Sequence, residues 1–148
     1  MSDNIEIRSI RWDITSKCNL SCLHCYAPNE SDNDLNYDQI VVILEKIMPL
    51  GLKEVNFSGR EPTLRKDLID IVKWCCNNSL TVNITTNGTT LIPETLKKLL
   101  SADINMLVFS LDGASAIAHD KIRGRGCFNK TIENITKCVE HIKVNRKN

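Results

Sequence analysis

The sequence is short of the residues and segments that mark non-globular chains. Its 148 residues include only 6 glycines and 4 prolines, and no segment repeats. Collagen, low-complexity and disordered sequences are therefore excluded. With 42% hydrophobic residues the chain can build one core, but it is short for a closed eight-stranded α/β barrel, which takes about 200 residues or more.

Excess charge and long apolar runs are also missing. Lysine and arginine number 19 against 18 aspartates and glutamates, so a basic surface for nucleic acid is not expected. No apolar stretch approaches the roughly 18 residues of a membrane helix, and the N-terminal residues lack the apolar segment of a secretion signal. We therefore expect a cytoplasmic protein without nucleic-acid or membrane partners.

Four short β-type runs each precede a segment with helical spacing of apolar residues, at residues 9–15, 54–58, 81–85 and 106–111. Strands separated by helices pair in parallel through right-handed crossovers. One strand face is apolar and the other polar, whereas a doubly wound sheet needs two apolar faces. We therefore predict an α/β fold, a partial (βα) barrel of about four βα units, with a parallel sheet, helices outside and a polar lumen for a ligand.

Proline and glycine predict several helix ends. Pro49 and Gly51 end the first predicted helix, and Pro93 stands near the first turn of the third. The fourth helix is predicted from Ile132, Ile135, Val139 and Ile142, which share one face.

Cysteine is the residue in which this sequence is rich. Seven cysteines in a chain without a secretion signal favour metal or cluster chemistry over disulfides. Cys18, Cys22 and Cys25 form a CxxxCxxC array after the first predicted strand, at the strand end where α/β barrels place their sites. Thiolates suit iron–sulfur clusters and zinc. Three local ligands leave one metal corner open to an exogenous group.

This array and the segments that follow it resemble the N-terminal half of the radical S-adenosylmethionine (SAM) enzymes, over roughly residues 11–142. In that family the CxxxCxxC motif holds a [4Fe-4S] cluster through three irons, and His24 occupies the aromatic position before the last cysteine. The resemblance implies that SAM chelates the fourth iron. Reductive cleavage of SAM would then release a 5′-deoxyadenosyl radical that abstracts hydrogen from a substrate.

The second predicted strand ends in Gly59-Arg60-Glu61-Pro62, which resembles the GGEP loop of the family. That loop binds the methionyl ammonium of SAM, so the resemblance assigns Gly59 and Glu61 to the cofactor. A carboxylate and backbone carbonyls suit a cation that has left water. Arg60 departs from the pattern, because it puts a bulky cation where glycine permits close backbone approach.

Two further strand ends and the segment beyond them complete the resemblance. Thr86 and Asn87 belong to a TTNG sequence and Ser110 to an SLDG sequence; hydroxyls at these strand ends contact the SAM carboxylate and ribose in the family. Residues 119–128 resemble the HDxxRGxGxF segment of the peptide-maturase and molybdenum-cofactor branch. The resemblance implies that Arg123 pairs with the SAM carboxylate as a bidentate guanidinium.

Other interpretations of the same residues stay open at this point. A zinc site completed by His24 or by a distant cysteine is the alternative for the clustered cysteines. For the remaining residues we expect structural rather than functional roles. We expect the core to contain Cys75, Cys76 and Cys138, loops or turns to contain Cys127, His119, Asp112 and Gly113, and a helix end or the surface to carry His141.

Six βα units are usual in the family, and four are predicted here. We expect residues 1–148 to form a single radical SAM core domain that lacks the C-terminal strands and any auxiliary-cluster domain. The apolar fourth strand would then be an open sheet edge, which a second chain could cover.

The predicted function is that of a radical SAM enzyme. By resemblance it acts on a peptide or a biosynthetic intermediate, with a flavodoxin or ferredoxin as reductant. The alternative is an inactive fragment, or a half-barrel completed by a partner, that binds a cluster or zinc without turnover.

Overall fold

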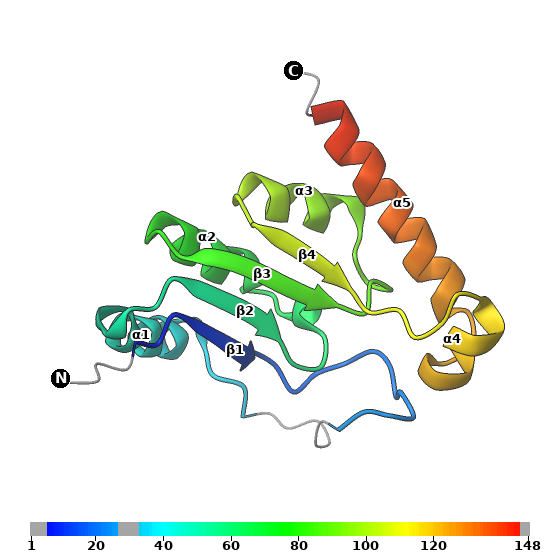
Figure 1. Ribbon diagram of the computed structural model, residues 1–148, viewed down its shortest axis with the longest axis horizontal. Helices are drawn as coiled ribbons and strands as arrows, with labels where there is room; N and C mark the ends of the chain where they lie inside the picture. The colour runs from blue at the N-terminus through cyan, green and yellow to red at the C-terminus, as the bar shows by residue number, and fades with distance from the viewer. Residues whose placement is uncertain (1–5, 27–32, 146–148) are drawn as a thin grey trace.

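The computed structural model describes residues 6–26 and 33–145, so residues 1–5, 27–32 and 146–148 of the expected domain lie outside the described residues. Four strands form one sheet in the order β1-β2-β3-β4, and all neighbours are parallel (Figure 1). The predicted α/β fold with a parallel sheet and about four βα units is confirmed. The strands are β1 (Ser9–Asp13), β2 (Glu54–Ser58), β3 (Thr81–Thr86) and β4 (Met106–Phe109).

Helices connect the strands and follow the last one. They are α1 (Tyr37–Ile47), α2 (Leu68–Asn77), α3 (Pro93–Ser101), α4 (Ala116–Arg123) and α5 (Cys127–Asn145), with the short 3₁₀ helices η1 (Met48–Leu50) and η2 (Pro62–Leu64). Because the strands follow chain order and crossovers are right-handed, α1, α2 and α3 lie on one face of the sheet (Figure 1). None of the described helices is long and apolar enough to span a membrane.

Local sequence explains the predicted helix ends. The Asn36 side chain accepts a hydrogen bond from the backbone N–H of Gln39 at 3.0 Å, and the Gln39 side chain accepts one from Asn36 N at 3.0 Å, which is a capping box for α1. Gly51 ends η1 with φ of 102°, in the left-handed region that glycine adopts readily. Pro93 begins α3. The helix ends predicted at Gly51 and Pro93 are confirmed.

The core lies between the sheet and the three crossover helices. Val55, Phe57, Val82 and Ile84 are 0% exposed and pack toward the helices. Each such side chain contributes roughly 1.5–3 kcal/mol when it is buried. Successive residues of a strand point to opposite faces. Asn56 and its partners on the adjacent strands, Arg11 and Asn83, therefore lie on the other, polar face, as the sequence predicts.

Strand β4 has a strand neighbour on one side only, within the described residues. Beside it, α3, β4 and α5 form a groove of about 830 Å³. Apolar side chains make up most of its lining, among them Leu100, Phe109, Val139 and Ile142. His141 is half-buried at this groove and lies near the C-terminal end of α5, which agrees with its expected place at a helix end. The open apolar edge expected from the sequence is present.

The segment after β4 differs from the sequence expectation. His119 lies in α4 and is 0% exposed, so it is not a loop residue, and Cys127 is buried at the start of α5 rather than in a loop. Side-chain caps explain the difference. The Ser115 hydroxyl accepts a hydrogen bond from Ala118 N at 3.4 Å, and the Asp120 carboxylate accepts hydrogen bonds from the backbone N–H groups that begin α5.

Smaller differences concern strand ends and cysteines. Strands β1 and β4 end two residues earlier than predicted, and β3 ends one residue later. Cys75 and Cys138 are buried in the core as expected, whereas Cys76 is half-buried and packs against its margin. All seven cysteines lie in the described residues, and none forms a disulfide.

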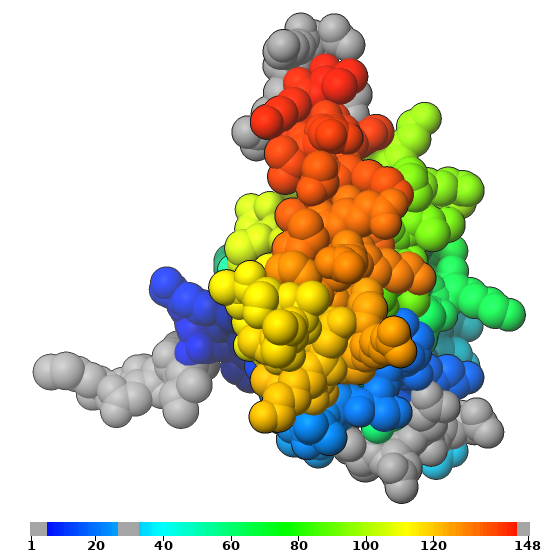
Figure 2. All heavy atoms as spheres, turned by 90° about the vertical axis from the view of Figure 1, so that its right-hand side faces the viewer, coloured from blue at the N-terminus to red at the C-terminus, as the bar shows by residue number. Residues whose placement is uncertain are grey.

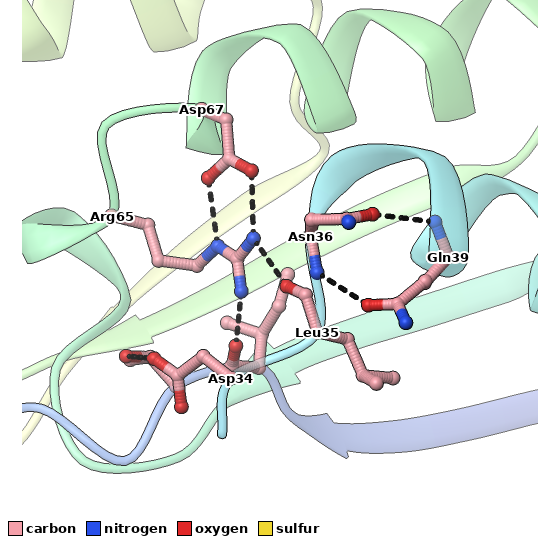
Figure 3. A network of polar contacts seen from close by, with 8 residues as sticks. Asp34, Leu35, Asn36, Gln39, Arg65 and Asp67 are labelled. Carbon is pink, nitrogen blue, oxygen red and sulfur yellow. Dashed lines mark hydrogen bonds and ion pairs between the residues drawn. The ribbon is translucent and has the colours of Figure 1, made fainter. Parts of the chain in front are cut away.

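Arg65 fastens the end of β1 to the helical layer (Figure 3). Its guanidinium donates to both carboxylate oxygens of Asp67, at 2.7 and 2.8 Å. It also donates to the backbone carbonyls of Ile14 at 2.7 Å and Leu35 at 2.9 Å. The Arg65 side chain is only 7% exposed. These four bonds fix the point at which the cysteine-bearing segment leaves the sheet.

Two carboxylates near Arg65 are held in their charged form. Burial alone would raise the pKa of Asp34, but hydrogen bonds from Thr15 and Ser16 and the charge of Arg65 outweigh it and lower this pKa. The hydrogen bond from Arg65 is the main reason why the pKa of Asp67 is also lowered. Both carboxylates therefore contribute to stability while they are ionised.

Arg65→Lys is expected to lower the free energy of unfolding by about 2 kcal/mol, because one ammonium cannot replace a planar fork with four bonds. Urea unfolding measures this effect, with exposed Arg125→Lys as the matched control.

The pH dependence tests the same contact. A lowered folded pKa gives stability that is present above the ordinary value of about 3.9 and lost as the pH falls through the folded pKa. Stability should fall below about pH 4, and less steeply in Arg65→Lys than in the wild type. Equal slopes would contradict the role assigned to Arg65.

Candidate functional site

The segment that carries the cysteine array follows β1 and lies over the carboxyl ends of the strands. Cys18 and Cys22 are half-buried and Cys25 is exposed. With residues from the strand ends, they line one pocket of about 280 Å³. Every site residue predicted from the sequence borders this pocket except Glu61. The other predicted residues at the pocket are His24, Gly59, Thr86, Asn87, Ser110 and Arg123.

The thiol groups have N–H donors and a cation nearby. Leu20 N lies 3.4 Å and the Asn87 side-chain nitrogen 3.9 Å from the Cys18 sulfur, and both donate to it. Burial raises the pKa of Cys22, the guanidinium of Arg123 opposes this change, and the neighbouring cysteines add to it. The pKa of Cys22 is therefore raised, and because metal binds the thiolate, metal binding would release this proton.

The donor set fits an iron–sulfur cluster in its chemistry. Three thiols share one pocket, and hydrogen bonds to sulfur are common around such clusters. Among the described residues, no group of three or more His, Cys, Asp or Glu side chains lies close enough together to hold a metal ion. The thiols therefore do not surround a single metal ion as they stand, whereas a cubane binds each of its cysteines through a different iron.

Glu61 lies beneath the pocket and is 0% exposed. Its Oε1 accepts hydrogen bonds from Thr63 N at 3.1 Å, the Thr63 hydroxyl at 2.5 Å and the Thr86 hydroxyl at 2.7 Å, and its Oε2 accepts one from Asn87 N at 2.7 Å. Its backbone N–H donates to Lys17 O at 3.0 Å. The sequence assigned this carboxylate to the cofactor, whereas in the structure it joins β2, β3 and the cysteine segment.

Amide and hydroxyl groups join the end of β3 to the cysteine segment. The Asn87 side chain donates to Asn19 Oδ1 at 3.0 Å, and Asn19 donates to the Thr89 hydroxyl at 2.8 Å. From α5, the Thr131 hydroxyl donates to the backbone carbonyl of Asn87 at 2.9 Å. Sequence reasoning missed Asn19, Thr89 and Thr131, and the only available signal was the position of Asn19 inside the cysteine motif.

Asp112 connects three of the sequence motifs. Its Oδ2 accepts a hydrogen bond from Arg123 Nε and lies 3.2 Å from His24 Nε2. Leu23 N also donates to Ile122 O at 2.9 Å, so the cysteine segment lies against α4 (Figure 2, blue beside yellow). Burial opposes ionisation of Asp112, but Arg123 and then His24 outweigh it and lower the pKa. Expected only as a turn residue, Asp112 is part of the site.

Gly59 and Arg60 of the GGEP-like loop differ in what the backbone requires. Gly59 has φ of +116°, and a Cβ there would lie 2.9 Å from Thr15 O, so this position needs glycine. Ser79 and Asp103 are the described non-glycine residues with positive φ, so the backbone of Arg60 is not strained. The Arg60 side chain borders the cysteine pocket, and its buried Nε has no hydrogen-bond partner in the described part of the chain.

The fold and the pocket together define a half-barrel with a cysteine-lined cofactor site. A family model of the radical SAM superfamily matches residues 12–147. The chain therefore belongs to the radical SAM superfamily, whose members bind a [4Fe-4S] cluster and SAM. The resemblance carried by the sequence motifs is confirmed.

Three curated relatives agree with the branch expected from the motifs. An AdoMet-dependent heme synthase of Methanosarcina barkeri is 36% identical over 132 residues, which are 86% of this chain and 38% of that protein. The mycofactocin maturase MftC of Mycolicibacterium smegmatis is 32% identical over 86% of this chain and 34% of its own length. A probable GTP 3′,8-cyclase of Methanocaldococcus jannaschii is 33% identical over 91% and 46%. The chain spans about a third to a half of these proteins.

Solved structures confirm the fold class. Streptococcus suis SuiB bound to S-adenosylmethionine matches with a TM-score of 0.78 and 21% identity, over 93% of this chain and 32% of that chain. SuiB bound to the precursor peptide SuiA matches with a TM-score of 0.77, also at 21% identity, over 93% and 31%. At this identity the likeness concerns the arrangement of strands and helices.

Glu61→Gln tests whether the buried carboxylate is needed as an acceptor. The amide would place an NH₂ group among four donors, so we expect the free energy of unfolding to fall by roughly 2 kcal/mol. Chemical denaturation measures it, with exposed Glu140→Gln as the control for the same change. An unchanged free energy would contradict the role assigned to Glu61.

Asp112→Asn tests the attachment of the cysteine segment to α4. Without the charge that His24 and Arg123 share, we expect the amide of Leu23 to exchange with solvent about tenfold faster. Hydrogen exchange of peptides within residues 18–26 measures the effect, with β3 as internal reference and exposed Asp103→Asn as control. Unchanged exchange in residues 18–26 would show that Asp112 does not hold the segment.

Proposed function

We propose that this chain binds a [4Fe-4S] cluster through Cys18, Cys22 and Cys25 and SAM in the adjoining pocket. One observation carries the proposal: in a radical SAM family member, these three thiols share a pocket with the ends of β2 and β3 and the residue that follows β4. Three cysteine ligands leave one iron of a cubane for an exogenous group. The α-amino and carboxylate groups of SAM suit that position.

The proposed cofactor residues are His24, Gly59, Glu61, Thr86, Asn87, Ser110 and Arg123. Gly59 lets the loop after β2 pack closely against the backbone at the end of β1, which shapes the pocket that it lines. Arg123 is held by Asp112 through Nε, and its terminal nitrogens suit a carboxylate. For Glu61 we propose an indirect role, since its oxygens fix Thr86 and the backbone of Asn87.

When bound, the cofactors supply a reduced cluster that cleaves SAM to a 5′-deoxyadenosyl radical, which abstracts hydrogen from the substrate. The chain orients the cofactors and limits the access of water. A peptide or a biosynthetic intermediate is the proposed substrate class, because the relatives are named for heme synthesis and mycofactocin maturation. SuiB, whose fold is shared, binds a precursor peptide.

A flavodoxin or ferredoxin is the proposed reductant. Seven cysteines without a disulfide suit a reducing compartment such as the cytoplasm.

We also propose that residues 1–148 form part of a single core domain that further strands or a second chain complete at β4. The support is the apolar groove of about 830 Å³ beside an edge strand. Met106 and Val108 of that strand are exposed. Exposed apolar edges of this kind promote association, so a covering element stabilises the sheet.

A second candidate is a protein that binds a cluster or zinc without turnover, as an inactive fragment or a half-barrel completed by a partner. The open β4 edge favours it. Zinc needs a fourth ligand, and His24 is the nearest candidate in the motif. His24 Nε2 already lies 3.2 Å from Asp112, which argues against that ligand set.

Anaerobic reconstitution with iron and sulfide, followed by electron paramagnetic resonance of the reduced protein, tests the proposal. We expect a cubane signal that shifts when SAM is added, because SAM would bind the open iron. Cys22→Ser should lose the iron, whereas Cys76→Ser, away from the pocket, should keep it. A cluster whose resonance signal does not change when SAM is added would favour the second candidate. A chain that takes up zinc but no iron would exclude the cluster.

A further inference from the structure

Two arginines at the cysteine pocket have no part in the proposed cofactor site. Arg11 lies on the polar face of β1, Arg60 follows β2, and both line the pocket. Among the described residues, no ion pair includes either of them, whereas Arg123 is paired with Asp112. No aspartate or glutamate of the described chain lines this pocket. The cationic side chains in the lining thus outnumber the anionic ones, which favours an anionic ligand beside Arg11 and Arg60.

Neutral groups hold Arg11 in position. Its Nε donates to the Ser58 hydroxyl at 3.0 Å, and its Nη2 lies 3.5 Å from the Tyr26 hydroxyl. The same two hydroxyls donate to the carboxylate of Asp13, from Ser58 at 2.8 Å and from Tyr26 at 3.3 Å, so they bridge Arg11 to Asp13. Arg11 is thus oriented without a direct ion pair.

Arg60 shows independently that a partner is missing. Its Nε is buried and makes no hydrogen bond in the described structure. Buried N–H groups are nearly always paired, and an unpaired cationic donor is costly. Arg60 borders the cysteine pocket and also a second pocket, which Trp12 and Asp34 line. Its unpaired Nε therefore suits an acceptor that the described residues do not provide.

Other polar groups on the same sheet face are already satisfied. The Asn83 side chain donates to Asn56 at 2.8 Å, and Asn105 donates to Asn83 at 2.9 Å. These amides bind each other across the strands, so they contribute little selectivity. Recognition of charge on this face falls to the two arginines.

We propose that Arg11 and Arg60 form a subsite for a carboxylate group of the substrate, on the sheet side of the cysteine pocket. The inference rests on the proposed function, because it places the substrate beside the SAM site. A guanidinium binds a carboxylate through two parallel hydrogen bonds, which fixes direction as well as charge. The carboxylate belongs either to a peptide or to a propionate-type side chain of a small molecule.

Binding of acids and their neutral derivatives to the full chain, reconstituted anaerobically with cluster and SAM, tests the subsite. One probe pair is N-acetyl-alanyl-phenylalanine and its C-terminal amide, and the other is mesoporphyrin IX and its dimethyl ester. The variants are Arg11→Gln and Arg60→Gln. Arg8→Gln is the matched control, because exposed Arg8 pairs with Glu6. Arg11→Lys and Arg60→Lys are used where a glutamine variant unfolds.

We expect the wild type to bind at least one acid more tightly than its neutral derivative. Each glutamine variant should lose about tenfold in affinity for that acid, the typical effect of one charged hydrogen-bond pair, and keep its affinity for the neutral derivative. The lysine variants should retain part of the preference, and Arg8→Gln all of it. The probe pair that shows the preference identifies the source of the carboxylate.

The proposal is overturned if the wild type prefers the acid in neither probe pair, which includes the case that no probe binds. It is also overturned if both glutamine variants keep the wild-type preference for the acid. The resonance shift on adding SAM is recorded in the same samples. If the variants lose that shift but keep the acid preference, the arginines bind SAM's own carboxylate and the subsite is again overturned. A wild type without the shift contradicts the proposed function separately.

Discussion

The candidate site depends on one buried carboxylate. Glu61 is fully enclosed, and four hydrogen bonds from the chain compensate for its removal from water. Those donors come from η2 and from the end of β3, and the backbone of Glu61 reaches the cysteine segment through Lys17. Because Thr86 and Asn87 also line the pocket, the position of the cofactor residues and the stability of the strand ends are coupled. Buried charges act in this way when they are fully satisfied.

The charges of the site divide into two groups. Asp112 pairs with Arg123 and contacts His24, and Asp67 pairs with Arg65, so these contacts hold segments together. Arg11 and Arg60 make no direct ion pair among the described residues, and Arg11 reaches Asp13 only through the hydroxyls of Ser58 and Tyr26. An arginine whose charge is uncompensated adds little to folding. Its retention at the pocket is more easily explained by a ligand than by stability.

Sequence could predict the sheet because its cause is local. Alternation of apolar and polar residues places Val55 and Phe57 in the core and Asn56 in the lumen without reference to the rest of the chain. The same holds for Gly51 and Pro93 at helix ends. It could not predict α4, since eight residues give only two turns of periodicity, and the Ser115 cap was not recognised.

The role of Glu61 was also beyond sequence, because a carboxylate in a cofactor motif suggests a ligand, and only tertiary packing shows that its oxygens are occupied. The role of Asp112 could not be predicted from sequence for a related reason. A turn signal describes its backbone, while its importance comes from Arg123 and His24, which the fold brings to it from α4 and from the cysteine segment. Three-dimensional neighbours thus decide which motif residues contact a ligand and which ones support those that do. In this chain, residues at the strand ends line the proposed cofactor pocket, and Glu61 and Asp112 support them from outside its lining.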